Sequence, residues 1–191
     1  QKKLLTAAIA TGYAAQISNA AMAHLDFVNI MSYDKTGPWT PDHPGQHAPY
    51  EMAVKDLTYW SITRGISPKK INLGLPFYGY SFAKELISGI PFADIVTKFT
   101  DAEKNDSVVL NDKTIIYYNG KETIRRKTKL AMQKAGGVMI WQLLQDAGGA
   151  NSLLTVIDET IHAGKKKSFI HLFDPECPGR RNPMTVADKT C

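Results

Sequence analysis

The sequence predicts an α/β protein in which helices cover a parallel sheet. Two observations predict it: short, continuously apolar runs recur along the chain, and amphipathic helical stripes alternate with them. A complete (β/α)8 barrel needs about 250 residues and eight such units. The 191 residues contain four buried-strand patterns of this kind. The pattern therefore predicts about half of a (β/α)8 barrel.

Two of these strands are predicted in the first 34 residues. Leu4–Ala10 is continuously apolar, which predicts a strand covered on both faces. A helix is predicted next, because one helical face carries Ala14, Ile17, Ala21 and Leu25. Phe27–Tyr33 predicts the second strand. The loop from Lys35 to Pro49 is rich in turn formers, with four prolines.

Two further helical stripes precede the remaining strands. The first stripe consists of Ala53, Leu57 and Trp60, and Gly65 follows where a C-terminal cap is expected. Ile71–Tyr78 predicts the third strand. After a short β run at Ile115–Tyr118, the second stripe consists of Ile124, Ala131, Met132 and Ala135. Val138–Leu143 predicts the fourth strand. A last helix is predicted from Leu153, Leu154, Ile157 and Ile161, with Asn151 or Ser152 as its cap.

Composition and charge exclude several classes of protein. A hydrophobic fraction of 43% and a charged fraction of 21% are ordinary for a globular chain and exclude a disordered or disulfide-rich class. No apolar run approaches the roughly 18 residues of a membrane span. Residues 165–191 predict an irregular basic tail, which carries +3 of the net charge of +5. We expect no nucleic-acid partner, because the remaining body is nearly neutral. Cys177 and Cys191 both lie in the tail, either paired or as free thiols.

Aromatic and acidic side chains gather where the predicted strands end. Met31, Tyr33 and Asp34 close the second strand, Tyr78 and Tyr80 the third, and Trp141 the fourth. Reactive side chains collect at the C-terminal ends of parallel strands. Flat aromatic surfaces beside hydroxyl and carboxylate groups suit a sugar ring, which stacks on one face and forms hydrogen bonds along its edge. The pattern therefore favours a carbohydrate site.

Structural roles are the alternative for each of these residues. A single aromatic residue at a strand end usually belongs to the core, and Asp34 alone could cap the loop after it. His43 and His47 have a spacing that would place two metal ligands together on a helix. Here they lie among prolines, so we expect neither a metal site nor a cofactor.

Four segments, in order, resemble the glycoside hydrolase family 18 chitinases. They are Phe27–Asp34 (FVNIMSYD), the loop from Gly37-Pro38-Trp39 to Ala48-Pro49, Ile71–Phe82 (INLGLPFYGYSF) and Gly136–Asp146 (GGVMIWQLLQD). The resemblance implies strands five to eight of the barrel. Residues 1–81 and 114–164 would form this half barrel, and residues 82–113 part of a small α+β insertion. It also implies a secreted protein whose missing N-terminal half carries the other four strands.

The resemblance also implies a reaction and roles for the residues. In the family, the N-acetyl group of the sugar attacks the anomeric carbon, in a substrate-assisted retaining mechanism on β-1,4-linked N-acetylglucosamine polymers. Tyr33 would bind that N-acetyl group, with Asp34 beside it. The remaining substrate contacts would be Met31, Trp39, Tyr78, Tyr80 and Trp141, although position 80 is often Arg in the family.

The acid of the family is absent from this sequence. It is the Glu at the end of a D-x-x-D-x-D-x-E strand, and no such segment occurs in the 191 residues. Each of the six glutamates falls in a predicted helix, the insertion or the tail. We therefore expect this chain alone to be inactive. Two alternatives are a non-catalytic chitin-binding lectin of the same fold and an assembly protein whose half barrels pair through open sheet edges.

Overall fold

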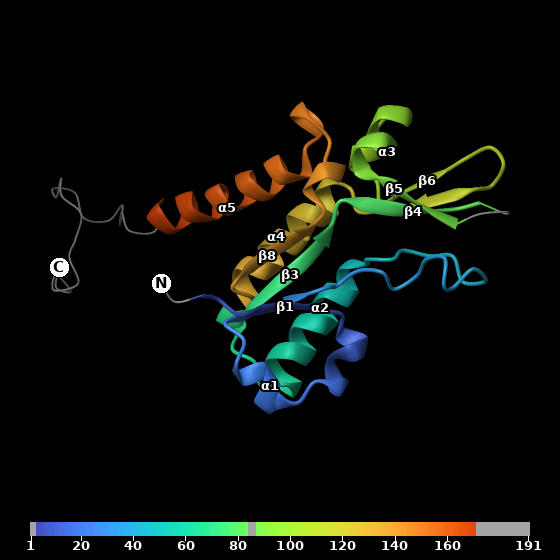
Figure 1. Cartoon of the computed structure of the whole chain (residues 1–191). Helices are drawn as coiled ribbons and strands as arrows, with labels where there is room; N and C mark the ends of the chain where they lie inside the picture. Colours follow the sequence, from blue (N-terminus) through green and yellow to red (C-terminus); the bar gives the residue numbers. More distant parts are fainter. Residues whose placement is uncertain (1–2, 84–86, 171–191) are drawn as a thin grey trace, which may run out of the picture.

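A parallel four-stranded sheet forms the body of the structure, a computed structural model that describes residues 3–83 and 87–170 (Figure 1). Its strands are β1 (Thr6–Ile9), β2 (Phe27–Ile30), β3 (Ile71–Pro76) and β8 (Gly137–Trp141), in the order β1-β2-β3-β8. Every neighbouring pair is parallel. The predicted fold class is confirmed: this is part of a barrel of the TIM type, with a smaller antiparallel sheet attached.

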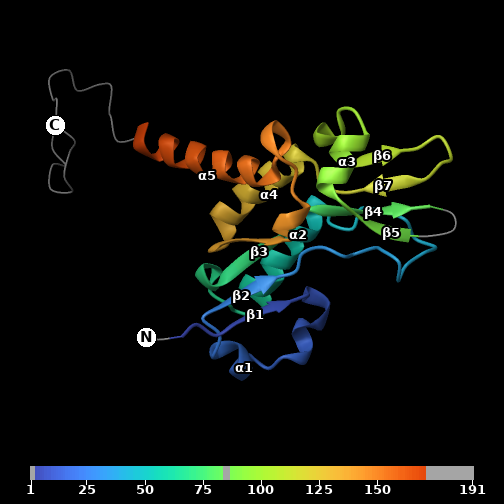
Figure 2. The ribbon, with the colours of Figure 1, turned by 45° about the horizontal axis from the view of Figure 1, so that its top comes forward.

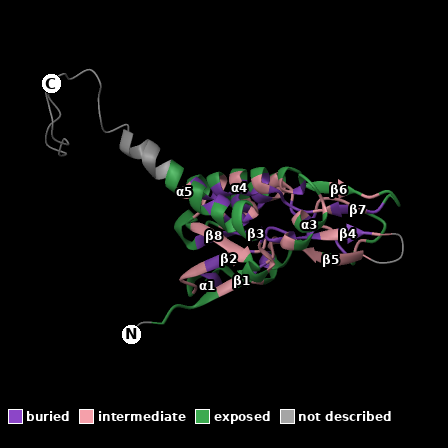
Figure 3. Ribbon diagram, turned by 90° about the horizontal axis from the view of Figure 1, so that it is seen from above, coloured by how far each residue is buried: buried purple, intermediate pink, exposed green. Residues whose placement is uncertain are grey.

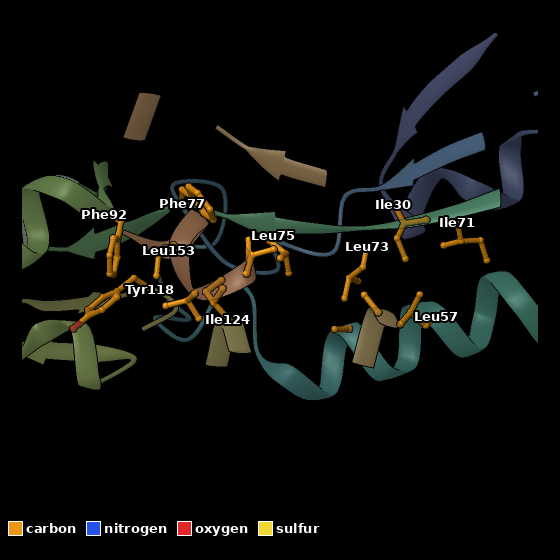
Figure 4. Close-up of a cluster of buried hydrophobic side chains, with 14 of the residues drawn as sticks. Ile30, Leu57, Ile71, Leu73, Leu75, Phe77, Phe92, Tyr118, Ile124 and Leu153 are labelled. Carbon is orange, nitrogen blue, oxygen red and sulfur yellow. The ribbon is translucent and has the colours of Figure 1, made fainter. Parts of the chain in front are cut away.

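Helices cover one face of the parallel sheet. They are α1 (Asn19–Ala23), α2 (Tyr50–Thr58), α4 (Lys121–Lys134) and α5 (Leu153–Ile170). Side chains of β3 point toward α2, where Leu73 and Leu57 are buried together (Figure 4). The α2 helix continues as a π-helical turn through Thr63, and Gly65 follows it with a φ of 63°. The predicted glycine cap therefore has the left-handed conformation that glycine adopts without steric cost.

The opposite face of the sheet is far less covered. In β1, Thr6 and Ala8 are exposed while Ile9 is buried. Figure 3 shows β8 mainly in the pink of half-buried residues. The prediction that the first strand is covered on both faces was therefore wrong. The reason is that no strand lies opposite the inner face of β1 in the described part of the chain.

The first predicted helix is two short helices. A 3-10 helix spans Thr11–Gln16, and α1 begins after Ser18, whose hydroxyl accepts a hydrogen bond from the Ala21 amide at 3.2 Å. Ile17 between them is extended. The Ala14 carbonyl accepts a hydrogen bond from the Ile17 amide at 3.1 Å, and the Arg64 guanidinium donates to the carbonyls of both Ala14 and Ile17. A side chain distant in sequence thus stabilises this break in the helix.

A second, antiparallel sheet extends from the end of β3. Its order is β5-β4-β7-β6, with β4 at Tyr78–Phe82, β5 at Ile87–Pro91, β6 at Ser107–Val109 and β7 at Ile115–Tyr117. This sheet and α3 (Phe92–Lys98) span residues 78–117. They include the predicted insertion 82–113 and extend beyond both of its ends. The predicted strand Ile71–Tyr78 was too long, because β3 ends at Pro76 and Tyr78 begins β4. Figure 2 shows the loop after β2 beside this sheet.

The last helix extends beyond its predicted end. Ser152 caps it by accepting a hydrogen bond from the Thr155 amide at 3.0 Å, as predicted. Residues 165–170 continue α5, so the prediction of an irregular tail from residue 165 was wrong for these residues. The rest of the tail, including Cys177 and Cys191, lies outside the described residues. Among the helices that are described, none combines the length and apolarity needed to cross a membrane.

Candidate functional site

A carboxylate at the end of the second strand is the centre of the candidate site. Asp34 lies four residues after the end of β2 and has a φ of 63°, a left-handed conformation that Asp tolerates better than most residues. Its Oδ1 accepts hydrogen bonds from the hydroxyls of Tyr78 and Tyr80, the latter at 3.2 Å. Both tyrosines belong to β4, so the site lies where the parallel and antiparallel sheets meet.

The electrostatics favour a charged carboxylate among neutral hydroxyls. Burial opposes the charge on Asp34, but its interactions with His47, Tyr78 and Tyr80 outweigh burial and hold its pKa below the ordinary value. Burial, with the Asp34 charge, raises the pKa of Tyr80 to about 12 and raises that of Tyr78 further. At neutral pH the two phenols are therefore hydrogen-bond donors, and Asp34 is an anion.

Tyr33 carries a buried hydroxyl that has no hydrogen-bond partner among the described residues. Its ring packs edge-on against Tyr78, with centroids 6.2 Å apart, and Met31 and Met139 pack around the same cluster. Gly74 makes room for the ring: a β-carbon there would lie 2.9 Å from Tyr33 Cε1. Burial, and secondarily Asp34, raises the pKa of Tyr33. An unpaired buried O–H is a donor available to a bound molecule.

Two tryptophans border this cluster with exposed rings. Trp39 lies over Gly37 and meets the Tyr80 ring edge-on at 5.6 Å, yet 54% of its surface is exposed. Trp141 ends β8 and is 55% exposed. Side chains alternate along a strand, so Trp141 shares a face with Met139, which packs against the cluster. Each ring therefore offers an apolar surface at the edge of the site.

The structure brings most of the predicted site residues into one network. Met31, Tyr33, Asp34, Tyr78 and Tyr80 are joined by packing and hydrogen bonds, and Trp39 joins them through Tyr80. Trp141 borders the network through the face of β8 and does not form a ring contact in it among the described aromatic pairs. The four glutamates of the described part lie on helices: Glu51 on α2, Glu103 on a 3-10 turn, Glu122 on α4 and Glu159 on α5.

The sequence did not identify His47 as part of this site. The His47 side chain is fully buried, with Nδ1 3.6 Å from Asp34 Oδ1 and Nε2 3.2 Å from the Tyr78 carbonyl oxygen. His43, four residues earlier, is exposed. Within the described ranges, no three His, Cys, Asp or Glu residues are grouped so as to hold a metal ion. The available sequence signal was the four-residue spacing of His43 and His47. That spacing brings two side chains together on a helix but does not indicate a shared site in a proline-rich loop.

The sequence and structure both match known chitinases. The family model for glycosyl hydrolases family 18 matches residues 1–146. Endochitinase 1 of Metarhizium robertsii is 26% identical over 161 residues, covering 68% of this chain and 38% of that protein.

Two solved structures are similar at higher identity. The chitinase ChiB of Flavobacterium johnsoniae superimposes with a TM-score of 0.78 at 39% identity, covering 85% of this chain and 51% of that one. A chitinase from Bacteroides thetaiotaomicron gives 0.70 at 36% identity, with coverages of 82% and 51%. The chain thus spans about half the length of these structures. Because the family model matches well over half of the sequence, the chain belongs to the glycosyl hydrolases of family 18.

Proposed function

We propose that this chain supplies one half of a chitinase barrel and its sugar-binding strand ends. The whole enzyme would hydrolyse β-1,4-linked N-acetylglucosamine polymers outside the cell. The observation that carries the proposal is one cluster that holds the charged Asp34 and the unpaired Tyr33 hydroxyl and is bordered by the exposed Trp39 and Trp141 rings. The barrel relatives, each about twice as long, supply the expectation of a second half.

The proposed chemistry uses the N-acetyl group of the substrate as the nucleophile. Tyr33 would donate its free O–H to the acetamide oxygen and orient it toward the anomeric carbon. Attack forms a bond between that oxygen and the anomeric carbon, while the bond to the leaving sugar breaks. The resulting oxazolinium ion is positive, and the Asp34 carboxylate nearby would stabilise that charge. Water then attacks the anomeric carbon and gives up a proton to the conjugate base of the acid that protonated the leaving sugar. The bond from the anomeric carbon to the acetamide oxygen breaks, which restores the N-acetyl group and retains the configuration.

The leaving sugar oxygen must receive a proton in the first step. The described glutamates lie on helices and not on strand ends, and the sequence has no D-x-x-D-x-D-x-E segment. The acid would therefore come from the other half of the barrel. Trp141 would form the floor under the sugar ring and Met31 its wall, while Trp39 would stack on a neighbouring sugar.

The test compares binding with turnover. We expect the 191-residue chain to release no product from tetra-N-acetylchitotetraose, and turnover by this chain alone would contradict the proposal. In an active two-half enzyme, Tyr33→Phe should lower kcat by roughly 10²-fold, because the acetamide oxygen loses the contact that orients it toward the anomeric carbon. His43→Gln in the exposed part of the loop is the matched control and should leave kcat unchanged.

A non-catalytic lectin is the second candidate, because the exposed Trp39 and Trp141 rings and the unpaired Tyr33 hydroxyl are binding features that need no proton donor. A lectin would keep the Tyr33 and Trp141 contacts without a proton donor. The residues of the complementary half distinguish the two functions. A Glu at the end of that pattern gives an enzyme, whereas another residue there gives a protein that binds the tetrasaccharide without cleaving it.

A further inference from the structure

We propose that His47 is a positioning residue: it fixes the turn that carries Asp34 and the backbone of Tyr78, and it directs an N–H at the Asp34 carboxylate when its ring is protonated. It is itself held by a buried clamp of Lys127 and Asn119. The inference rests on the proposed function, because it gives His47 a role through Asp34. It is supported by the contacts of His47 with the turn at Asp34 and with Tyr78 at the start of β4.

His47 binds the chain on both sides of the site. Its backbone carbonyl accepts a hydrogen bond from the amide of Lys35, the residue after Asp34, at 2.8 Å. Its Nε2 lies 3.2 Å from the Tyr78 carbonyl oxygen. The imidazole also packs against the two phenol rings, with centroids 4.9 Å from Tyr78 and 5.1 Å from Tyr80. One buried side chain therefore connects the turn at Asp34 with the start of β4.

The geometry at Nε2 determines the tautomer. A carbonyl oxygen can only accept, so the hydrogen in the Nε2 contact belongs to His47. In the neutral ring, Nδ1 then has a lone pair, and it faces Asp34 Oδ1 at 3.6 Å. Protonation of the ring places an N–H in that position, directed at the carboxylate. The contact between His47 and Asp34 thus depends on one proton at Nδ1.

The clamp holds the residue after His47. The Ala48 carbonyl accepts hydrogen bonds from Lys127 Nζ at 2.7 Å and Asn119 Nδ2 at 3.0 Å. Lys127 Nζ also donates to Asn119 Oδ1 at 2.7 Å. Lys127 and Ala48 are fully buried, and 1% of the Asn119 surface is exposed. These bonds join α4 and the end of the antiparallel sheet to the loop that carries His47.

The residue before His47 is fixed as well. Gln46 Nε2 donates to the backbone carbonyls of Asp106 and Tyr118, the first at 3.1 Å, and Gln46 Oε1 accepts from the Ala48 amide at 3.2 Å. The segment Gln46–Ala48 is therefore held on both sides. This leaves the His47 ring little freedom to turn away from Asp34.

The charged and titratable groups that act on the His47 ring are Asp34, Tyr78, Tyr80 and Lys127. Burial lowers the pKa of His47 and Lys127 adds to that effect, whereas Asp34 opposes it. The ring is thus neutral at neutral pH. When the ring is protonated, its Nδ1–H favours the Asp34 carboxylate and lowers the Asp34 pKa.

The experiment follows the Asp34 carboxyl 13C shift against pH in the 191-residue chain and in two variants. His47→Gln can replace the Nε2 donor to Tyr78 but places no group at Nδ1, so the Asp34 pKa should rise by about one unit. His47→Asn places an amide donor near the Nδ1 position, so it should retain much of the low Asp34 pKa. His43→Gln, in the same loop, should leave the titration unchanged.

A purely structural His47 gives a different result. In that case His47→Gln and His47→Asn would lower the melting temperature while the Asp34 pKa stayed at its wild-type value, and the proposal would be overturned. If neither variant folds, 15N spectra of the wild-type imidazole still decide. The proposal requires the imidazole to gain its Nδ1 proton at a higher pH than the one at which Asp34 is protonated, and the reverse order would overturn it.

A measurement of sugar binding tests the proposed function separately from the Asp34 titration. In an active two-half enzyme, His47→Gln should weaken tetra-N-acetylchitotetraose binding about tenfold, an effect comparable to one charged hydrogen bond. If the wild-type enzyme binds no acetamido sugar, the proposed function fails, while the Asp34 titration still decides the role of His47. If the wild type binds and His47→Gln binds equally well, the positioning role fails alone.

Discussion

The Tyr78 hydroxyl donates a hydrogen bond to the Asp34 carboxylate across 44 residues of sequence. Asp34 follows the second strand of the parallel sheet, and Tyr78 is the first residue of the antiparallel sheet. The bond therefore connects the two sheets at the point where the candidate site lies. The effect of this bond on the pKa of Asp34 can be measured directly.

Removing this bond should make Asp34 a weaker acid. Tyr78→Phe removes a donor that favours the carboxylate, so the Asp34 pKa should rise toward its ordinary value, as observed by 13C NMR. Tyr59→Phe, on the π-helical turn away from Asp34, is the control. An unchanged Asp34 pKa in Tyr78→Phe would show that the bond does not stabilise the charge.

The same low pKa links the site to stability in acid. Asp34 has a lower pKa folded than unfolded, so it stabilises the fold above its unfolded pKa. This contribution is lost as the pH falls through the folded value. We expect the free energy of unfolding to fall less steeply below pH 4 in Asp34→Asn than in wild type, measured by urea denaturation. Equal slopes would contradict the prediction.

Local patterns were enough to predict the strands and the residues at their ends. The apolar runs ending near Asp34 and Trp141 are visible without knowledge of tertiary contacts. Their ends were predicted too late, because β2 ends at Ile30 and not at Tyr33, and β8 ends at Trp141 and not at Leu143. Arg64 and His47 show what local patterns miss. Arg64 supports the break between the first two helices from 47 residues away, and His47 reaches Tyr78 across 31. Such contacts depend on how distant segments pack.

Exposure on the inner face of β1 was missed for a related reason. The continuous apolar run predicts burial on both faces, but burial depends on what lies opposite. In the described chain the sheet has an edge at β1, and Thr6 and Ala8 remain exposed. The run is consistent with a strand whose second face is covered by the proposed other half of the barrel.

Gly74 should be intolerant of a side chain. A β-carbon there would lie 2.5 Å from the Ile30 carbonyl oxygen and 2.9 Å from Tyr33 Cε1. The backbone contact is not relieved by rotating a side chain, so Gly74→Ala should lower the free energy of unfolding by about 1–3 kcal/mol. Gly12→Ala is the control, because nothing lies within 4 Å of its β-carbon. Similar losses for both variants in urea denaturation would contradict this account.

Gly37, unlike Gly74, should tolerate a side chain without a loss of stability. A β-carbon at Gly37 would lie 2.6 Å from the far end of the Trp39 ring, which is half exposed and can move. Gly37→Ala should therefore leave stability nearly unchanged but displace Trp39, altering tryptophan fluorescence. Gly45→Ala has an ordinary contact at 3.9 Å and serves as the control. A large loss of stability, or unchanged fluorescence, would contradict the prediction.

Lys127 should make stability rise with pH on the alkaline side of neutrality. Burial lowers its pKa to about 7, against the opposing effect of Asp106, Asp56 and Glu51. Between pH 7 and its unfolded pKa, the unfolded chain binds this proton and the folded chain does not, so raising the pH favours folding. The free energy of unfolding of wild type should rise relative to Lys127→Met by about 1.4 kcal/mol per pH unit between pH 8 and 10.

The comparison with Lys127→Met isolates this group from the tyrosines. Their raised pKa values make stability fall only above pH 10, where the unfolded phenols ionise first. Lys129→Met, on the same helix, should follow the wild-type pH dependence. A constant difference in unfolding free energy between wild type and Lys127→Met across pH 8–10 would mean that Lys127 is charged when buried. The hydrogen bond from Lys127 to the Ala48 carbonyl would then come from a charged ammonium group.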